Sequence, residues 1–173
     1  MKRNLELWQF GGFALSTLGG TLLHFVYEWT ESPWAAPFSG VNESTWEHMK
    51  LLYYPMLLFA LAQSRRFRDV PAFWCVKLRG MLTGLMLIPV LFYTCNGAIG
   101  PSPDWVNIAI FFVAAAVAYW AEWRWFRRGV DGCRPRVALV ALCAVGVLFA
   151  VFTFWPPRLP LFRDPVSGGY GIG

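Results

Sequence analysis

Long apolar runs separated by short basic segments are the feature that most limits what this chain can fold into. The run from Val137 to Trp155 contains no charged residue, and similar runs recur along the chain. A helix of about 20 apolar residues is long enough to cross the hydrocarbon core of a bilayer. A helix also satisfies its own backbone hydrogen bonds, which lipid cannot do. The sequence therefore predicts an all-α integral membrane bundle.

Composition excludes several other classes of protein. Of the 173 residues, 57% are hydrophobic and 14% are charged, whereas soluble domains carry about 25% charged residues. A soluble globular domain, a disordered chain and a coiled coil are all excluded. The net charge of +5 does not indicate a nucleic-acid partner, because the basic residues fall in short blocks between apolar runs. The expected partner is the lipid bilayer.

The apolar runs predict one transmembrane domain, residues 1–173, with five helices. The first run is too long for the apolar core of a signal peptide, so we read it as an uncleaved span. Its glycine pairs would allow close approach of a neighbouring helix. The tail, residues 156–173, is rich in Pro and Gly and is expected to be non-helical. The predicted spans are residues 7–29, 43–63, 78–96, 105–121 and 137–155.

The distribution of basic residues predicts the orientation of these spans. With the N-terminus inside, only Lys50, Arg158 and Arg163 of the 15 Lys and Arg residues fall outside. Segments inside the cell carry an excess of Lys and Arg. The N-terminus is therefore expected inside, the C-terminus outside, and the protein in a plasma membrane.

The second predicted helix is unusually short in apolar residues. The stretch from Leu51 to Ala62 has 12 residues, which cover roughly 18 Å of a core about 30 Å thick. Arg65 follows on the inner side, so the helix must extend outward. That extension draws Glu47 and His48 to the membrane boundary, where ionisable groups are functional candidates.

Both histidines of the chain lie near this outer end, together with three carboxylates. His24 and Glu28 are spaced i, i+4, as are Glu43 and Glu47, and His48 follows directly. Residues at this spacing share a helix face. An antiparallel helix pair with a short connection would bring the two faces together.

Imidazole and carboxylate ligands suit Zn, Fe or Mn. We expect His24, Glu28, Glu47 and His48 to bind such a metal. Glu43 and Glu47 are the candidate catalytic carboxylates, with one of them serving as general base. A metal-dependent hydrolase acting on a lipid-like substrate is the enzymatic form of this hypothesis.

Structural explanations of the same residues stay open. Ser44 and Glu47 have the spacing of a capping box, Lys50 lies where it can pair with Glu47, and His24 and Glu28 can simply hydrogen-bond. One alternative function is a carrier or channel for a small solute or cation that uses the carboxylates as a relay. Another is a structural accessory subunit, so the sequence leaves open whether the protein is an enzyme.

Three further expectations concern residues outside the cluster. The tail is apolar enough to fold back over the bundle, and Asp164 would then cover the site or add a ligand. Glu122 is expected to form an ion pair at the surface. None of the four cysteines forms a C-x-x-C pair, so no disulfide framework is expected.

Two segments resemble a known family. The sequence Asn42-Glu-Ser-Thr-Trp-Glu-His-Met-Lys, the preceding Leu23-His-Phe-Val-Tyr-Glu and the ending from Pro160 to Ile172 are similar to a family of small bacterial multi-spanning membrane proteins of unknown function. The resemblance implies a bacterial inner membrane and no particular reaction. It draws attention to eight residues: His24, Glu28, Asn42, Glu43, Glu47, His48, Asp164 and Tyr170.

Overall fold

The computed structural model describes residues 2–100 and 102–172, and within those ranges it contains five α-helices and no strand. The all-helical prediction is confirmed. Three of the helices, α3, α4 and α5, are long and apolar enough to cross a membrane. The elements are α1 (Lys2–Thr30), α2 (Thr45–Arg66), α3 (Phe73–Ile99), α4 (Asp104–Arg128), α5 (Pro135–Phe154) and the 3₁₀ helix η1 (Pro160–Phe162).

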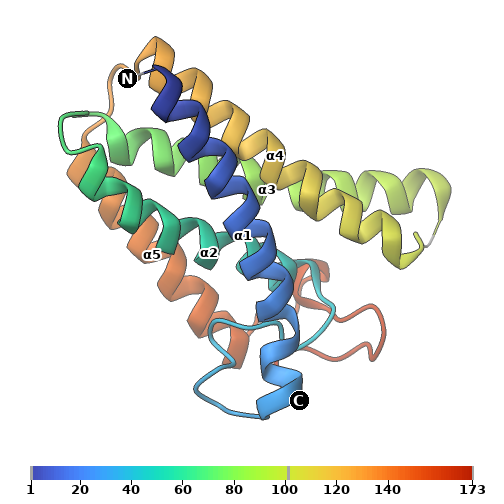
Figure 1. The fold of residues 1–173 in the computed structure, drawn as a ribbon. Helices are drawn as coiled ribbons and strands as arrows, with labels where there is room; N and C mark the ends of the chain where they lie inside the picture. Colours follow the sequence, from blue (N-terminus) through green and yellow to red (C-terminus); the bar gives the residue numbers. More distant parts are fainter. Residues whose placement is uncertain (1, 101, 173) are drawn as a thin grey trace.

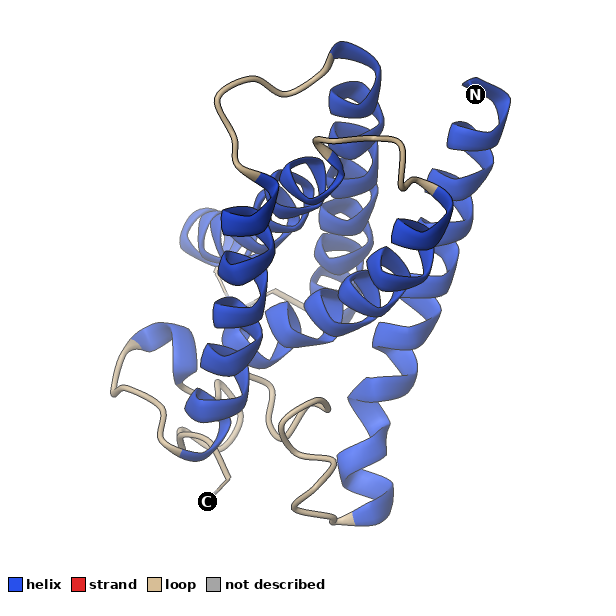
Figure 2. Ribbon diagram, turned by 90° about the vertical axis from the view of Figure 1, so that its left-hand side faces the viewer, coloured by secondary structure: helices blue, strands red, loops and turns tan. Residues whose placement is uncertain are grey.

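Apart from the facing ends of α3 and α4, which lie to the right in Figure 1, the connections between helices gather at two ends of the molecule (Figures 1 and 2). The start of α1, the α2–α3 linker (residues 67–72) and the α4–α5 loop (residues 129–134) lie at one end, which we call the basic end. The α1–α2 loop (residues 31–44) and the C-terminal tail (residues 155–172) lie at the other, which we call the histidine end. The tail was expected to be non-helical, but it includes the single turn of η1.

Small residues let α1 lie directly against its neighbours. A Cβ atom at Gly20 would lie 2.7 Å from the backbone oxygen of Leu51 in α2. A Cβ atom at Gly12 would lie 2.5 Å from the ring of Tyr119 in α4. Only a residue without a side chain permits this approach, so Gly12 and Gly20, one member of each glycine pair, serve packing within the chain.

A Lys–Glu ion pair is buried near the basic end. Lys77 Nζ of α3 lies 2.5 Å from Glu122 Oε2 of α4, and the two side chains are 1% and 0% exposed. Four aromatic rings surround the ammonium group at 5.5–5.8 Å: Phe59, Phe73, Tyr119 and Phe126. The expectation of a surface ion pair at Glu122 was wrong, because the partner of Glu122 lies 45 residues away in the sequence and faces it across the α3–α4 interface.

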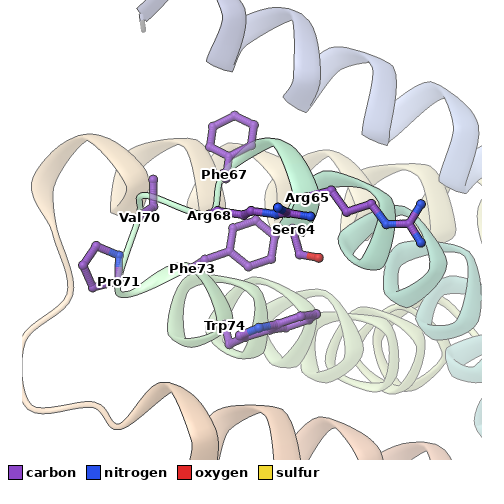
Figure 3. Close-up of a pocket in the computed structure, with 8 residues that line it drawn as sticks. All are labelled: Ser64, Arg65, Phe67, Arg68, Val70, Pro71, Phe73 and Trp74. Carbon is purple, nitrogen blue, oxygen red and sulfur yellow. The ribbon is translucent and has the colours of Figure 1, made fainter.

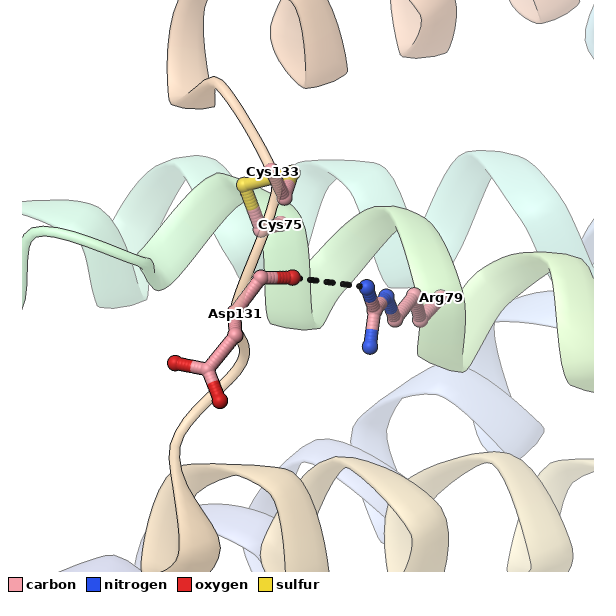
Figure 4. The surroundings of a disulfide bond; sticks show 4 residues. All are labelled: Cys75, Arg79, Asp131 and Cys133. Atoms are coloured by element: carbon pink, nitrogen blue, oxygen red, sulfur yellow. Dashed lines mark hydrogen bonds between the residues drawn. A yellow bond between two sulfur atoms is a disulfide. The ribbon is translucent and has the colours of Figure 1, made fainter.

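A disulfide joins the first turn of α3 to the α4–α5 loop (Figure 4). It links Cys75 and Cys133, which are 58 residues apart in the sequence. Arg79 adds a hydrogen bond from its guanidinium to the backbone oxygen of Asp131, at 3.3 Å. The expectation of no disulfide was wrong for this pair, because it rested on short cysteine spacings and these two cysteines meet only after the helices pack.

We predict that Glu122→Gln lowers the free energy of unfolding by about 3–5 kcal/mol, because it leaves the Lys77 ammonium buried without a counter-ion. The double variant Lys77→Met/Glu122→Leu should recover most of this loss, since it removes both buried charges. Unfolding in detergent, followed by circular dichroism, measures both effects. Glu6→Gln, on the exposed face of α1, is the control, and an equal effect of Glu6→Gln and Glu122→Gln would contradict the prediction.

Candidate functional site

Two histidines and one carboxylate come together at the histidine end. His24 lies in the last third of α1, and His48 lies in the first turn of α2. Their rings are 5.7 Å apart between centroids. The carboxylate of Glu43 lies between them, with Oε1 at 3.4 Å from His24 Nε2 and Oε2 at 3.5 Å from His48 Nε2. We call these three side chains the His–Glu–His cluster.

The start of α2 explains how Glu43 reaches both rings. Asn42 Oδ1 accepts the backbone N–H of Ser44 at 2.9 Å, which turns the chain just before the helix. Ser44 is the N-cap and its hydroxyl accepts the N–H of Glu47, which is one half of the expected capping box; the other half is absent, because Asn42 takes the N–H of Ser44 and Glu47 accepts from Val41 instead. Glu43 therefore precedes the helix, and its side chain is not carried along the helix face with Glu47.

The orientation of His48 is set by a backbone bond. Its Nδ1 lies 3.0 Å from the carbonyl oxygen of Ser44. A carbonyl only accepts, so Nδ1 carries the hydrogen and, in the neutral ring, Nε2 carries a lone pair. That lone pair faces an oxygen of Glu43, which is also an acceptor. The two acceptors can lie side by side favourably only if a cation or a proton lies between them.

Glu47 does not join the cluster. It lies 2.5 Å from Lys50 Nζ, and the two side chains are 2% and 0% exposed. Its Oε2 also accepts the backbone N–H of Val41 at 3.1 Å. Lys50 donates further to the backbone oxygen of Ala36 and to the hydroxyl of Thr153, each at 2.8 Å. This Glu47–Lys50 clamp ties the α1–α2 loop to α2 and α5, and it engages Oε2 of Glu47 twice.

Lys50 was counted among the residues outside the membrane on sequence grounds. In the structure its side chain is fully buried, because it turns from the start of α2 toward the loop and α5. The alternative that Lys50 pairs with Glu47 is the one that the structure shows.

Glu28 also lies apart from the cluster. It is on the exposed side of α1, and within residues 2–100 and 102–172 its carboxylate forms no ion pair and no side-chain hydrogen bond. The i, i+4 spacing places it one turn from His24, but the imidazole of His24 turns toward Glu43 instead.

The C-terminal tail folds back onto this end of the molecule. Asn42 Nδ2 donates to the backbone oxygen of Gly171 at 3.0 Å. Arg163 and Tyr170 pair through their backbones as an isolated antiparallel bridge, and Gly168 takes a φ of 74° in the turn between them. Tyr170 thus shapes the tail, and Asn42 fastens the tail to the α1–α2 loop.

Asp164 closes this turn and is buried. Its carboxylate accepts the backbone N–H groups of Val166 and Ser167, at 3.0 and 3.3 Å, and the hydroxyl of Ser167 at 2.5 Å. Burial by itself raises the pKa of Asp164, but these bonds and the N–H of Glu43 outweigh it and hold that pKa below its ordinary 3.8. Asp164 therefore fastens the tail beside Glu43.

A hollow of about 340 Å³ lies next to the tail. Asp164, which borders it, accepts the backbone N–H of Glu43, so the hollow and the His–Glu–His cluster are neighbours. Arg163 and Tyr93 contribute a cation and a hydroxyl to its wall. The full lining is Thr45, Phe92, Tyr93, Pro160, Arg163, Asp164 and Pro165.

The part of the chain that the structure describes contains no set of three or more His, Cys, Asp or Glu side chains already positioned to hold a metal ion. Of the four predicted ligands, the structure brings together His24 and His48, leaves Glu28 exposed and pairs Glu47 with Lys50. Glu43, considered from the sequence as a catalytic carboxylate, is the acidic group between the imidazoles. Its position just before the N-cap is the sequence signal that distinguishes it from Glu47.

Comparison with known proteins identifies a family. The model of a family of unknown function (DUF6512) matches residues 1–172. No curated protein and no solved structure matches the chain.

We predict that Asp164→Asn loosens the tail by about 1.5–3 kcal/mol, the usual contribution of hydrogen bonds to a charged group. Because the pKa of Asp164 is lowered in the folded state, its contribution is present above about pH 3.8 and is lost as the pH falls through the folded value. Hydrogen exchange of residues 160–172 measures both effects. Asp104→Asn, at the exposed start of α4, should leave the tail unchanged; equal loosening by both variants would count against the prediction.

Proposed function

We propose that this chain, which belongs to the DUF6512 family of unknown function, is a multi-span membrane protein that binds a divalent metal ion at the His–Glu–His cluster. The supporting observation is the lone pair of His48 Nε2, which faces Glu43 Oε2 at 3.5 Å while Nδ1 is committed to the carbonyl of Ser44. A bound cation removes the repulsion between these two acceptors. The backbone bond to Nδ1 is also the type of second contact that orients metal-binding histidines.

The spacing of the cluster supports a small transition metal. Ligand atoms at about 2.0–2.2 Å from a tetrahedral zinc ion lie roughly 3.3–3.6 Å from each other. The distances from His24 Nε2 to Glu43 Oε1 and from His48 Nε2 to Glu43 Oε2, 3.4 and 3.5 Å, fall in this range, with a different carboxylate oxygen facing each imidazole. Two imidazoles and one carboxylate suit Zn, Fe or Mn, and three protein ligands leave a position open for a substrate.

The enzymatic form of the proposal is a hydrolase for a lipid-like substrate. A divalent ion held by the cluster would supply Lewis-acid chemistry at the membrane boundary. The neighbouring hollow offers the Arg163 guanidinium and the Tyr93 hydroxyl to an anionic group such as a phosphate ester. The Glu47–Lys50 clamp holds the loop from which Glu43 extends, so Glu47 is proposed as a positioning residue.

A second candidate function is favoured by the same contact. A proton between His48 Nε2 and Glu43 would satisfy the two acceptors as well as a metal would. In this candidate the protein is a carrier, and Glu43 relays protons between the hollow and the two imidazoles. The two candidates differ in whether a metal is bound stoichiometrically.

The proposed topology has five spans, with the N-terminus inside and a multi-pass location in a bacterial inner membrane. The bias of Lys and Arg toward the basic end supports this orientation. The Cys75–Cys133 disulfide lies at that same end, although disulfides persist mainly in oxidising compartments. The two features point to opposite sides of the membrane, and cysteine labelling decides between them.

For the proposed orientation, we predict that a membrane-impermeant maleimide labels Cys95, near the outer end of α3, in intact cells. Cys133 should be labelled only after the membrane is opened and the disulfide is reduced, whereas Cys75 is buried and does not report orientation. The variant Cys143→Ala removes labelling at the exposed cysteine of α5. Labelling of Cys133 in intact, reduced cells, with Cys95 protected, would reverse the orientation.

For the metal site, we predict that purified protein contains one equivalent of Zn, Fe or Mn by elemental analysis. His24→Ala, His48→Ala and Glu43→Gln should each weaken binding by more than about 100-fold, since loss of an outer-shell partner alone costs 10–100-fold. Glu28→Gln is the matched control, because this carboxylate is one turn from His24 yet outside the cluster. No metal in the wild-type protein, or equal loss in Glu28→Gln, would contradict the metal site.

A further inference from the structure

A second hollow lies at the basic end, far along the bundle from the histidines. It has a volume of about 390 Å³ and is formed by the last turn of α2, the linker and the first turn of α3 (Figure 3). Arg65, Arg68 and Ser64 line it on the polar side, and Figure 3 shows the Arg65 side chain extending away from the Arg68 guanidinium. Phe67, Val70, Pro71, Phe73 and Trp74 form the apolar wall.

The two guanidinium groups of this hollow have no carboxylate partner. The ion pairs found within residues 2–100 and 102–172 involve His24, His48, Lys50 and Lys77, and none involves an arginine. Both arginines are exposed, and the neighbouring Asp69 pairs with neither. In Figure 3 the Arg68 guanidinium lies beside Ser64, with Phe73 and Trp74 below it. The hollow thus presents unneutralised positive charge next to aromatic surface.

This combination matches one chemical group well. A planar guanidinium forms paired hydrogen bonds with phosphate oxygens, and Trp side chains are favoured where the bilayer meets water. Basic pockets beside transmembrane helices bind the headgroups of anionic lipids. A zwitterionic headgroup carries no net negative charge, so Arg65 and Arg68 attract it less strongly than an anionic headgroup.

We propose that this hollow binds the phosphate of an anionic phospholipid, with Arg65 and Arg68 on the headgroup and Phe67 and Trp74 against the glycerol and first acyl carbons. The site is independent of the His–Glu–His cluster, since it lies at the opposite end of the molecule (Figures 1 and 2). A lipid bound in this hollow contacts the end of α2, the α2–α3 linker and the start of α3.

Native mass spectrometry of the detergent-solubilised protein tests the proposal, with phosphatidylglycerol as probe and phosphatidylcholine as the zwitterionic comparison. Wild-type protein should retain one phosphatidylglycerol in preference to phosphatidylcholine. Arg65→Gln/Arg68→Gln should weaken retention about 30-fold, from roughly fivefold for each basic side chain near an anionic lipid. Arg65→Lys/Arg68→Lys, which keeps the charge, should retain the lipid at intermediate strength.

The matched control removes the same charge from the same end of the molecule. Arg134 and Arg136 are exposed and lie outside the hollow, so Arg134→Gln/Arg136→Gln should leave retention within about threefold of wild type. Equal losses in the two Gln variants would show general attraction to the surface and overturn the proposal. Displacement of the lipid by an equal concentration of inorganic phosphate would also overturn it, because the ligand would then be free phosphate.

Discussion

Charged side chains inside an apolar bundle must find partners, and this requirement organises both ends of the molecule. Water is absent from the interior, so an ionised group without a counter-ion is strongly unfavourable there. At the histidine end, the Glu47–Lys50 clamp answers this requirement and takes up the oxygen of Ala36 and the hydroxyl of Thr153. One ion pair thereby positions a loop and two helices.

The candidate site depends on this clamp. Glu47 lies inside the helix and is neutralised by Lys50, whereas Glu43 lies before the N-cap and stays half-exposed between two imidazoles. Two carboxylates that are one turn apart in sequence therefore have different roles. The C-terminal tail adds to the difference between Glu43 and Glu47. Asn42 and Asp164 fasten the tail beside Glu43, and the tail borders the neighbouring hollow.

The basic end is built differently. Its buried pair, Lys77 and Glu122, lies deep between α3 and α4 inside a ring of aromatic side chains, and the Cys75–Cys133 bond fastens the α4–α5 loop to α3. Arg65, at the end of α2, and Arg68, in the α2–α3 linker, lie outside this packed region, and neither forms an ion pair among the described residues. Unneutralised surface charge beside a rigidly packed region suits the binding of an anionic headgroup. The two histidines lie at the opposite end of the molecule.

The sequence by itself determined the all-helical class, the approximate position of each helix and the gathering of both histidines at one end, because the lengths of apolar runs and the placement of charges are local properties. It also anticipated the cap at Ser44 and the option of a Glu47–Lys50 pair, which depend on spacings of three residues. Only the tertiary structure decided which carboxylate faces the imidazoles, since the sequence favoured Glu28 and Glu47 as ligands and the loop path places Glu43 between the two rings instead. Packing likewise decided that Lys77 pairs with Glu122 and that Cys75 pairs with Cys133. The partners are 45 and 58 residues apart, and no local pattern in a single sequence indicates contacts over such separations.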